Sequence, residues 1–468
     1  MKNFFMTLFC FLLAIPLMAQ NTLPDWALGG FVRPEGVNPV ITTSNRSFRC
    51  PMRETKILWE ESDVFNPAAT VKDGKIVVLY RAEDKTAMGI GKRTSRIGYA
   101  ASKDGLRMKK RNKPVLYPCQ DEFAQYDNPG GCEDPRVTMT EDGLYVMAYT
   151  SWNRKKPRLS IATSRDLKHW QKHGPAFAKA YDGKFMNIES KSASMVTKVV
   201  NGQQVITKIN GKYFMYWGEH KMYAATSDDL INWYPVLDEK GELAVVIKPR
   251  NGFFDSALTE CGPPAVLTDK GIVLLYNGKN RKDDKRDKRF TAGAYCGGQI
   301  LCDAKDPMKV LDRLDVPFFR PMAAFEKSGQ YVDGTVFLEG LVYFHDKWFL
   351  YYGCADSQVG VAIYDPAVKT PGDNLKSSKN RHLDYEKYSF IGRSTLCSWH
   401  SSTTKERGTN SRPHLSGLTR RAWRQSGVGD EESRRGKPDS RTTFLNRLYH
   451  NGLVAGNNSR YSAQLTGI

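Results

Sequence analysis

The sequence lacks the close cysteine pairs that hold zinc, and its nine cysteines do not stand with histidines at zinc-ligand spacing. The common structural zinc sites are therefore excluded. The cysteine spacing predicts no disulfide framework, so we expect these residues to be buried and to act as small apolar side chains. The sequence predicts neither a metal nor a cofactor.

Long hydrophobic runs are also lacking, apart from one at the start of the chain. Lys2 is followed by an almost wholly apolar stretch from Phe4 to Met18 and then by Ala19-Gln20. A spanning helix needs roughly 20 residues, and this run is shorter. Because Cys10 lies inside the run, a lipoprotein anchor is not favoured. We predict a cleaved signal peptide over residues 1–20, a secreted or periplasmic bacterial protein, and no membrane partner.

Acidic residues are too few to balance the basic ones, and the net charge is +19. A nucleic-acid partner is not predicted, since no recognised binding motif accompanies this charge. Residues 371–468 hold 17 basic and 8 acidic residues, which is roughly half of the excess.

Residues 374–468 have few apolar runs and are rich in Ser, Arg, Thr and Asn. Such a composition buries too little surface to form a core. We predict a basic tail that is disordered or non-native, and we assign it no function.

Five segments of the remaining chain share one pattern, a short apolar strand that ends in small residues and an Asp turn. They begin near residues 97, 159, 222, 298 and 359. A second strand type, such as Ile76-Val-Val-Leu-Tyr, precedes each of them after a tight turn. The repeat predicts an all-β, five-bladed β-propeller over residues 21–373, with polar groups converging on a central channel. A β-sandwich of unrelated hairpins is the alternative.

Carboxylates at predicted strand ends are the candidate catalytic groups, because a pair of them facing the channel can divide the donation and the acceptance of a proton. Asp134 lies in Glu-Asp-Pro-Arg, Glu260 in Glu-Cys-Gly-Pro-Pro, and Glu219 directly follows an apolar strand. Glu339 is a reserve candidate. For Asp134 a structural ion pair is an equally good interpretation, and any one of the Glu residues alone is more often an ion-pair partner than a catalyst.

Other polar residues at strand ends are candidates for binding the hydroxyl groups of a polar substrate. Asn66, Arg81 and Asp356 belong to this set. Trp152 and Trp217 are candidates for stacking on the face of a substrate ring, although aromatic residues in such strands more often belong to the core.

Several of these motifs together resemble the β-mannoside phosphorylase family, glycoside hydrolase family 130. They are Phe65-Asn-Pro, Tyr80-Arg-Ala, Ser95-Arg-Ile-Gly-Tyr-Ala, Glu133-Asp-Pro-Arg, Gly262-Pro-Pro and Tyr352-Gly-Cys-Ala-Asp. The resemblance implies a five-bladed propeller and an inverting enzyme that acts on a mannose-containing oligosaccharide. It also implies that Asp134 is the proton donor, acting through a sugar hydroxyl.

Two departures from the family pattern bear on the reaction. This chain has Gly218-Glu219 where phosphorolytic members typically show His-Arg, and Asn277-Gly278 where they show His-Gly. A carboxylate repels a phosphate dianion and suits the deprotonation of water. The pattern therefore resembles the hydrolytic branch, which acts on β-1,2-linked mannosides. We expect Glu219 and Glu260 to flank one water, with Asp134 on the far face of the sugar.

Three alternatives to this hydrolase remain at this point. The first is a mannoside phosphorylase, in which the cations Arg96, Arg136 and Lys191 would hold phosphate; we include these three among the predicted substrate-binding residues. The second is a carbohydrate-binding propeller without turnover, although its acidic set is intact. The third is a furanosidase propeller, which the Glu260-Cys261 element would fit. The sequence predicts no oligomeric state.

Overall fold

The computed structural model describes residues 23–368 except 88 and 90. These residues belong to one unit bounded by Met1 and His382. Strands dominate it, and its only helical segments within the described ranges are α1 (Ala124–Asp127) and the 3-10 turn η1 (Ala324–Glu326). The predicted all-β class is confirmed. The signal peptide and the tail, predicted for 1–20 and 374–468, lie outside the described residues.

The strands pair with their sequence neighbours in successive antiparallel groups. The first group contains β3 (Asp63–Lys72), β4 (Lys75–Glu83), β5 (Ser95–Ser102) and β6 (Lys109–Lys110). The second contains β7 (Gly131–Met139), β8 (Tyr145–Trp152), β9 (Pro157–Ser164) and β10 (Gln171–Pro175). A separate hairpin, β1 (Ser47–Cys50) and β2 (Thr55–Leu58), precedes them.

The later groups follow the same order of pairing. The next contains β11 (Ala193–Val200), β14 (Lys212–Trp217), β15 (Met222–Ser227) and β16 (Tyr234–Pro235), with β12 (Gln203–Ile206), β13 (Lys208–Ile209) and β17 (Val245–Ile247) attached. After it come β18 (Leu258–Cys261), β19 (Ala265–Leu267), β20 (Ile272–Lys279), β21 (Tyr295–Cys302) and β22 (Val310–Arg313). The last contains β23 (Val336–Phe344), β24 (Lys347–Cys354) and β25 (Gln358–Tyr364).

The second strand of the first group shows why these sequences fold as they do. β4 is a nearly continuous apolar run, and its side chains alternate between two different cores. Ile76 and Val78 pack with the strands of the last group, whereas Val77 and Leu79 pack with the second group. Because successive side chains of a strand point to opposite faces, an apolar run is what a strand between two packed layers requires.

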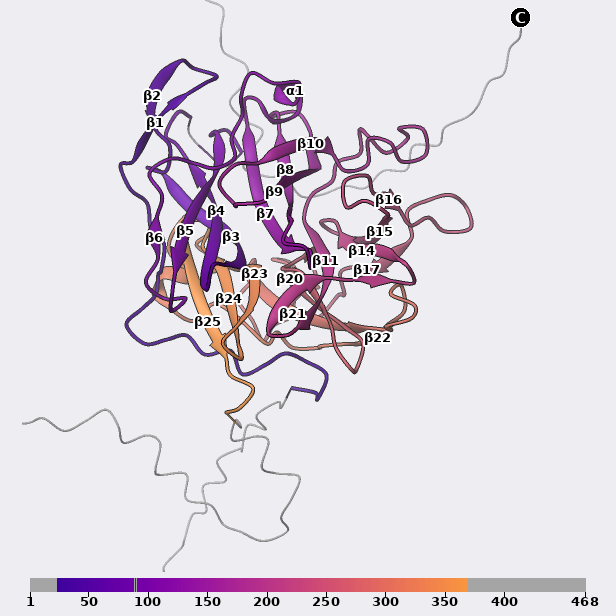
Figure 1. Ribbon diagram of the computed structural model, residues 1–468. Coiled ribbons are helices and arrows are strands. Elements are labelled where there is room, and N and C mark those ends of the chain that lie inside the picture. The colour runs from indigo at the N-terminus through magenta and orange to yellow at the C-terminus, as the bar shows by residue number, and fades with distance from the viewer. Residues whose placement is uncertain (1–22, 88, 90, 369–468) are drawn as a thin grey trace, which may run out of the picture. The chain divides into compact units, whose positions relative to one another are not determined.

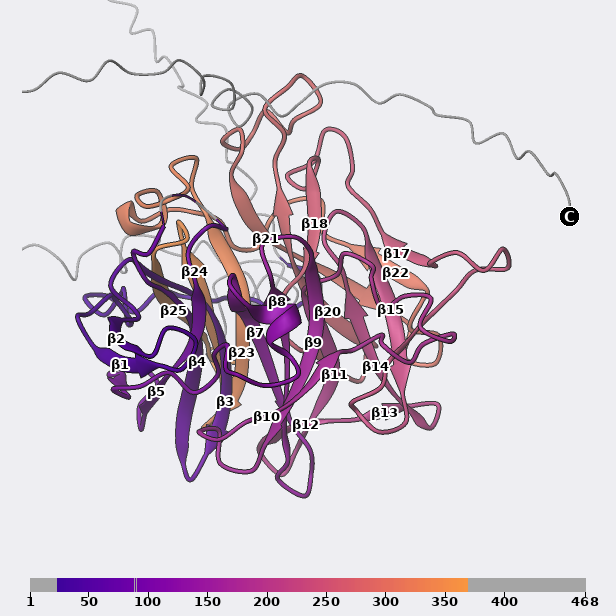
Figure 2. The ribbon, with the colours of Figure 1, turned by 90° about the horizontal axis from the view of Figure 1, so that it is seen from above.

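The first and last groups lie against each other, so the ends of the described unit meet. The orange strands β23–β25 lie beside the indigo strands β3–β5 in both ribbon views (Figure 1 and Figure 2). An N-terminal segment also pairs with β25, through antiparallel bridges from Val32 to Ile363 and from Ile41 to Val359. The arrangement is propeller-like.

The described cysteines agree with the expectation of mostly buried side chains. All seven described cysteines are free, and all but Cys119 are buried. No helix among the described residues is long and apolar enough to cross a membrane.

Candidate active site

Bulges in β3 and β7 aim polar side chains into the interior of the unit. The pairing of β3 with β4 shifts register around Asn66, and that of β7 with β8 shifts around Asp134. Both residues have positive φ, 47° and 48°, in the left-handed region that Asn and Asp tolerate better than most residues. Pro67 and Pro135 follow them and remove a ladder donor at that point. The bulges therefore re-aim Asn66 and Asp134 out of the regular alternation.

These bulges open onto a pocket of about 270 Å³. Residues from distant parts of the chain line it, and eight of them were predicted from the sequence: Asn66, Arg81, Asp134, Trp152, Lys191, Glu219, Glu260 and Asp356. Two clusters, each built around one cation, stand out among the side chains that line it.

The first cluster is built on Arg81, which we call the guanidinium cluster. Arg81 Nη1 lies 3.0 Å from Asp134 Oδ1, and Nη2 lies 2.8 Å from Glu133 Oε1 and 2.7 Å from Glu83 Oε1. Asn66 Nδ2 donates a second hydrogen bond to Asp134 Oδ1, at 2.8 Å. One guanidinium thus serves three carboxylates, which its forked set of donors allows.

The carboxyl groups of the guanidinium cluster have opposite protonation preferences. Burial would raise the pKa of Asp134, but the charges of Arg81, Lys191 and Arg136 outweigh burial and lower that pKa to about 2. For Glu133 burial prevails over Arg81, and the negative charges of Asp134 and Glu83 add to it, so the pKa rises to about 7. In the free protein Asp134 is therefore ionised, whereas Glu133 holds a proton below about pH 7.

The second cluster is built on Lys191, which we call the ammonium cluster. Lys191 Nζ lies 3.3 Å from Glu219 Oε1 and 3.5 Å from Glu260 Oε1. The two carboxylate oxygens are therefore at most 6.8 Å apart, the sum of those two distances, and the two residues form a β-bridge. Glu219 and Glu260 thus lie close together, on either side of the Lys191 ammonium group.

Glu260 is the more enclosed carboxyl group of the ammonium cluster. It is 1% exposed and accepts a hydrogen bond of 2.5 Å from Ser192 Oγ. Burial, assisted by the charge of Glu219 and opposed by Lys191, raises its pKa to about 7. The ammonium group responds in the opposite sense: burial would lower the pKa of Lys191, but Glu260, Glu219 and Asp134 raise it well above its usual value. Lys191 thus stays charged.

Polar atoms without partners mark where a ligand would bind. Asn66 Oδ1, Thr150 Oγ1 and Thr335 Oγ1 are buried, line this pocket and have no hydrogen-bond partner. Asp356 lies in the turn after β24 with φ 53°, and burial raises its pKa to about 7. Unsatisfied buried acceptors are costly, so these groups are suited to the hydroxyls of a sugar.

Two predicted substrate-binding cations do not line the pocket. Arg96 is 1% exposed and pairs with Asp84 at 2.9 Å. Arg136 lies 3.0 Å from Glu339 Oε1 and donates to the carbonyl oxygen of Cys261. Both act within buried networks. Glu339, the reserve catalytic candidate, is fully buried and is likewise absent from the pocket lining.

The aromatic candidates differ from each other, and sequence reasoning missed several lining residues. Trp152 lines the pocket, whereas Trp217 is a core residue that is 1% exposed. The missed residues are Thr150, Thr335, Tyr295, Tyr331 and Phe337, and Glu133 had no assigned role. Glu133 directly precedes Asp134, so its place in the motif was a signal for it.

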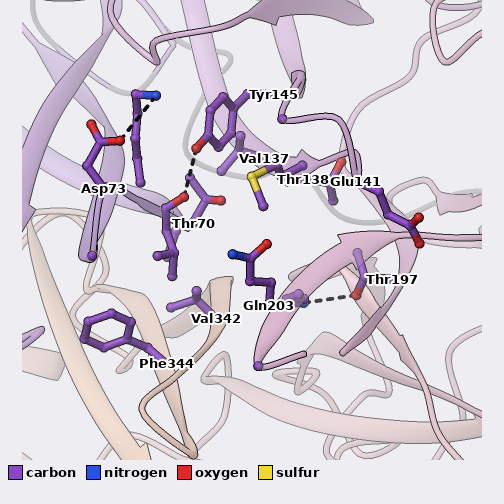
Figure 3. Close-up of a pocket in the computed structure, with 18 residues that line it drawn as sticks. Thr70, Asp73, Val137, Thr138, Glu141, Tyr145, Thr197, Gln203, Val342 and Phe344 are labelled. Atoms are coloured by element: carbon purple, nitrogen blue, oxygen red, sulfur yellow. Dashed lines mark hydrogen bonds and ion pairs between the residues drawn. The ribbon is translucent and has the colours of Figure 1, made fainter. Parts of the chain in front are cut away.

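A second cavity, of about 330 Å³, is lined by residues at the opposite ends of β3 and β7. Figure 3 shows the side chains that line it. Thr70 and Thr138 line it together with Gln203. Nearby hydroxyls are already satisfied, since Tyr145 donates to the Val71 carbonyl and Thr197 donates to that of Ala265. This cavity has no carboxylate cluster like those described above. Nowhere in residues 23–368, with 88 and 90 left aside, does a set of His, Cys, Asp or Glu side chains form a metal site.

Comparison with known proteins places this pocket in a family of sugar-cleaving enzymes. Residues 42–368 match the model of glycoside hydrolase family 130, described as β-1,4-mannooligosaccharide phosphorylase. A 1,2-β-oligomannan phosphorylase of Thermoanaerobacter sp. (strain X514) is 33% identical over 312 residues, which cover 66% of this chain and 91% of the relative.

Solved structures give a similar result at higher identity. A glycosyl hydrolase from Bacteroides ovatus is 62% identical, with a TM-score of 0.74 and coverage of 75% of this chain and 97% of that one. Another is 63% identical, with a TM-score of 0.73 and coverage of 75% and 98%; it is described with the finding that the family of mannoside phosphorylases contains glycoside hydrolases that target β-1,2-mannosidic linkages in Candida mannan. The chain therefore belongs to glycoside hydrolase family 130, a family of glycoside hydrolases and mannoside phosphorylases.

Proposed function

We propose that the protein is an inverting, exo-acting β-mannosidase that hydrolyses β-1,2-mannosidic linkages and releases mannose. The observation that carries this proposal is the ammonium cluster, in which one Lys191 is shared by Glu219 and Glu260. A phosphate dianion at this place would meet two carboxylates and only one cation, and that cation is already paired. Like charges at such short range repel strongly where water is excluded.

The same cluster suits the activation of water. We assign Glu260 as the general base, because its pKa of about 7 matches a base that works near neutral pH. Glu219, whose side chain is 32% exposed, holds Lys191 from the other side and orients the water. The water oxygen bonds to the anomeric carbon as its proton passes to Glu260.

The guanidinium cluster supplies the proton for the leaving group. The glycosidic C–O bond breaks, and the leaving oxygen takes a proton that Asp134 donates through a sugar hydroxyl. Asp134 is ionised in the free protein, so the proton cannot come from Asp134 alone. It comes from the Glu133–Asp134 pair, which holds one proton, on Glu133, up to about pH 7. Solvent restores it after product release.

The remaining lining residues bind the sugar. We assign Asn66, Arg81 and Asp356 to hydroxyl groups of the mannose, with Thr150 and Thr335 as further partners. Trp152 offers an aromatic face, of the kind that packs against the apolar side of a sugar ring.

We also propose that the five antiparallel groups are the blades of a five-bladed propeller, and that the protein is secreted or periplasmic. The pairing of each group and the contact between the first and last groups support the first point. The apolar run near the N-terminus supports the second. N-terminal sequencing of the exported protein tests the cleavage near residue 20.

A mannoside phosphorylase is the second candidate, because two curated relatives at 33% and 30% identity are phosphorylases. One experiment separates the two reactions. Purified protein is incubated with β-1,2- and β-1,4-mannobiose, with and without phosphate, and the products are identified. Free mannose at a rate that ignores phosphate is expected; mannose 1-phosphate as the main product would overturn the hydrolase proposal.

A further inference from the structure

A concave surface on the first strand group carries charge of one sign. This cavity, which we call the basic groove, has a volume of about 700 Å³ and is formed by β5, β6 and the loops beside them. β6 lies at the outer edge of this group, at the left in Figure 1. Six of its lining cations form no ion pair with any described carboxylate: Lys75, Lys103, Arg107, Lys109, Arg111 and Lys168.

The groove holds little negative charge to offset them. Asp104 is its one lining carboxylate, and it is engaged locally, accepting hydrogen bonds from Ser102 Oγ and from the backbone N–H groups of Leu106 and Arg107. A seventh cation, Lys110, is paired with Glu60 at 3.0 Å. Concave surfaces lined by one sign of charge focus the field and concentrate counter-ions, so the basic groove is suited to a polyanion.

The lining also narrows the class of polyanion. Tyr99 lines the groove and is half-buried, because it packs against the apolar core between the first and second strand groups. A membrane surface is disfavoured, because none of the exposed large apolar residues in the described part of the chain lies in the groove. A single-stranded nucleic acid is disfavoured because such sites stack successive bases on several aromatic rings, and this groove has one.

We propose that the basic groove binds an anionic glycan, one that carries phosphate, sulfate or carboxylate groups, and so recruits acidic mannose polymers to the enzyme. This rests on the proposed function in one respect, that the pocket cleaves mannosides. The groove and the pocket share a strand: Lys75 begins β4 and Arg81 lies six residues further, about 20 Å along an extended chain. Binding at the groove raises the local concentration of cleavable ends.

Binding is tested on the full chain with dextran sulfate as the probe and neutral dextran of equal length as its control. The test variant is Lys103→Glu/Arg107→Glu/Lys109→Glu. The matched variant is Lys179→Glu/Lys240→Glu/Lys305→Glu, which changes the net charge equally at exposed lysines without ion pairs in the described structure. We expect the groove variant to bind dextran sulfate at least about tenfold more weakly than the matched variant, with an affinity that falls as salt rises.

Three results would overturn the proposal: equal losses in the two variants, equal binding of neutral dextran, or tighter binding of anionic lipid vesicles or single-stranded DNA through the same residues. Turnover is measured separately. The groove variant should hydrolyse β-1,2-mannobiose normally but show a raised KM for mannan bearing phosphate esters. If the wild type fails to cleave mannobiose, the proposed function is wrong, and the dextran sulfate result still decides the groove.

Discussion

Both sides of the pocket bring several carboxylates close together, and each side offsets their repulsion with a different cation. In the guanidinium cluster three carboxylates share Arg81, and in the ammonium cluster two share Lys191. On the first side Asp134 is stabilised as an anion, while its neighbour Glu133 keeps a proton. On the second side the buried Glu260 has a raised pKa of about 7.

The difference shows how geometry divides roles among chemically similar groups. A guanidinium group has five donors in one plane and holds several carboxylates at fixed positions, so that one of them can be stabilised as an anion more than the others. An ammonium group is a compact charge, which offsets only part of the burial of Glu260. In the proposed mechanism, one side stores and delivers a proton, and the other accepts one.

Removing the donor should produce the largest effect. We expect Asp134→Asn to lower kcat/KM for β-1,2-mannobiose by at least about 10²-fold, the usual scale for general acid catalysis. The fold should persist because the amide is isosteric, and circular dichroism checks this. Asp269→Asn, at an exposed site, serves as the control. Near-normal activity of Asp134→Asn would remove this residue from the mechanism.

The next largest effect is expected at Glu260, the proposed general base. Glu260 must be ionised to accept a proton, so the acidic limb of the activity profile should have an apparent pKa of about 7, while loss of the proton on Glu133 should limit activity above that pH. We expect Glu260→Gln to lower kcat by about 10²-fold and to abolish this acidic limb of the pH profile. Glu219→Gln should lower kcat less and retain the limb. A profile with the limb intact in Glu260→Gln and lost in Glu219→Gln would exchange the two roles.

Removing the charge of Lys191 should shift the pH profile rather than abolish activity. Its charge lowers the pKa of Glu260, so removing it should raise that pKa further. We expect Lys191→Met to move the acidic limb upward by about one pH unit, with roughly a tenfold loss at pH 6. Lys191→Arg keeps the charge and should leave the limb in place. An unmoved limb in Lys191→Met would contradict the assignment of the limb to Glu260.

Glu133 should affect stability with a defined sign. Its pKa in the folded protein, about 7, lies above its usual value of 4.5, so the folded state holds an extra proton between these values. The free energy of unfolding therefore falls as pH rises through this window. The side chain in Glu133→Gln cannot ionise. On going from pH 5 to pH 8, the free energy of unfolding of this variant should therefore rise by on the order of 1–2 kcal/mol relative to that of the wild type. Urea unfolding at both pH values measures this, with the exposed Glu239→Gln as control; an equal pH dependence in wild type and Glu133→Gln would refute it.

The smallest effect is expected from truncation after about residue 375. The family match ends at residue 368, and both clusters lie before it. The shortened protein should fold and retain its kcat and its pH profile, as measured side by side with the full chain. Insoluble or inactive protein would mean that the tail contributes to the unit.

The sequence predicted the strands well because their apolar runs and Asp turns are local signals. The alternation of side chains was harder to follow. Ser95 donates to Glu133 at the pocket, but Arg96, one residue later on β5, points to the opposite face and pairs with Asp84. Both Asn-Pro and Asp-Pro were recognised as motifs, yet the bulges that turn Asn66 and Asp134 inward depend on pairing with β4 and β8, which only the folded sheet defines.

The bridge between the N-terminal segment and β25 has a consequence for how the protein folds. Asn38 exchanges two hydrogen bonds with Val361, 2.9 Å and 2.8 Å long, across 323 residues of sequence. Contacts of such long range form slowly, because a large loop must close before they contribute any stability. The last strand group thus cannot be completed until nearly the whole unit has left the ribosome.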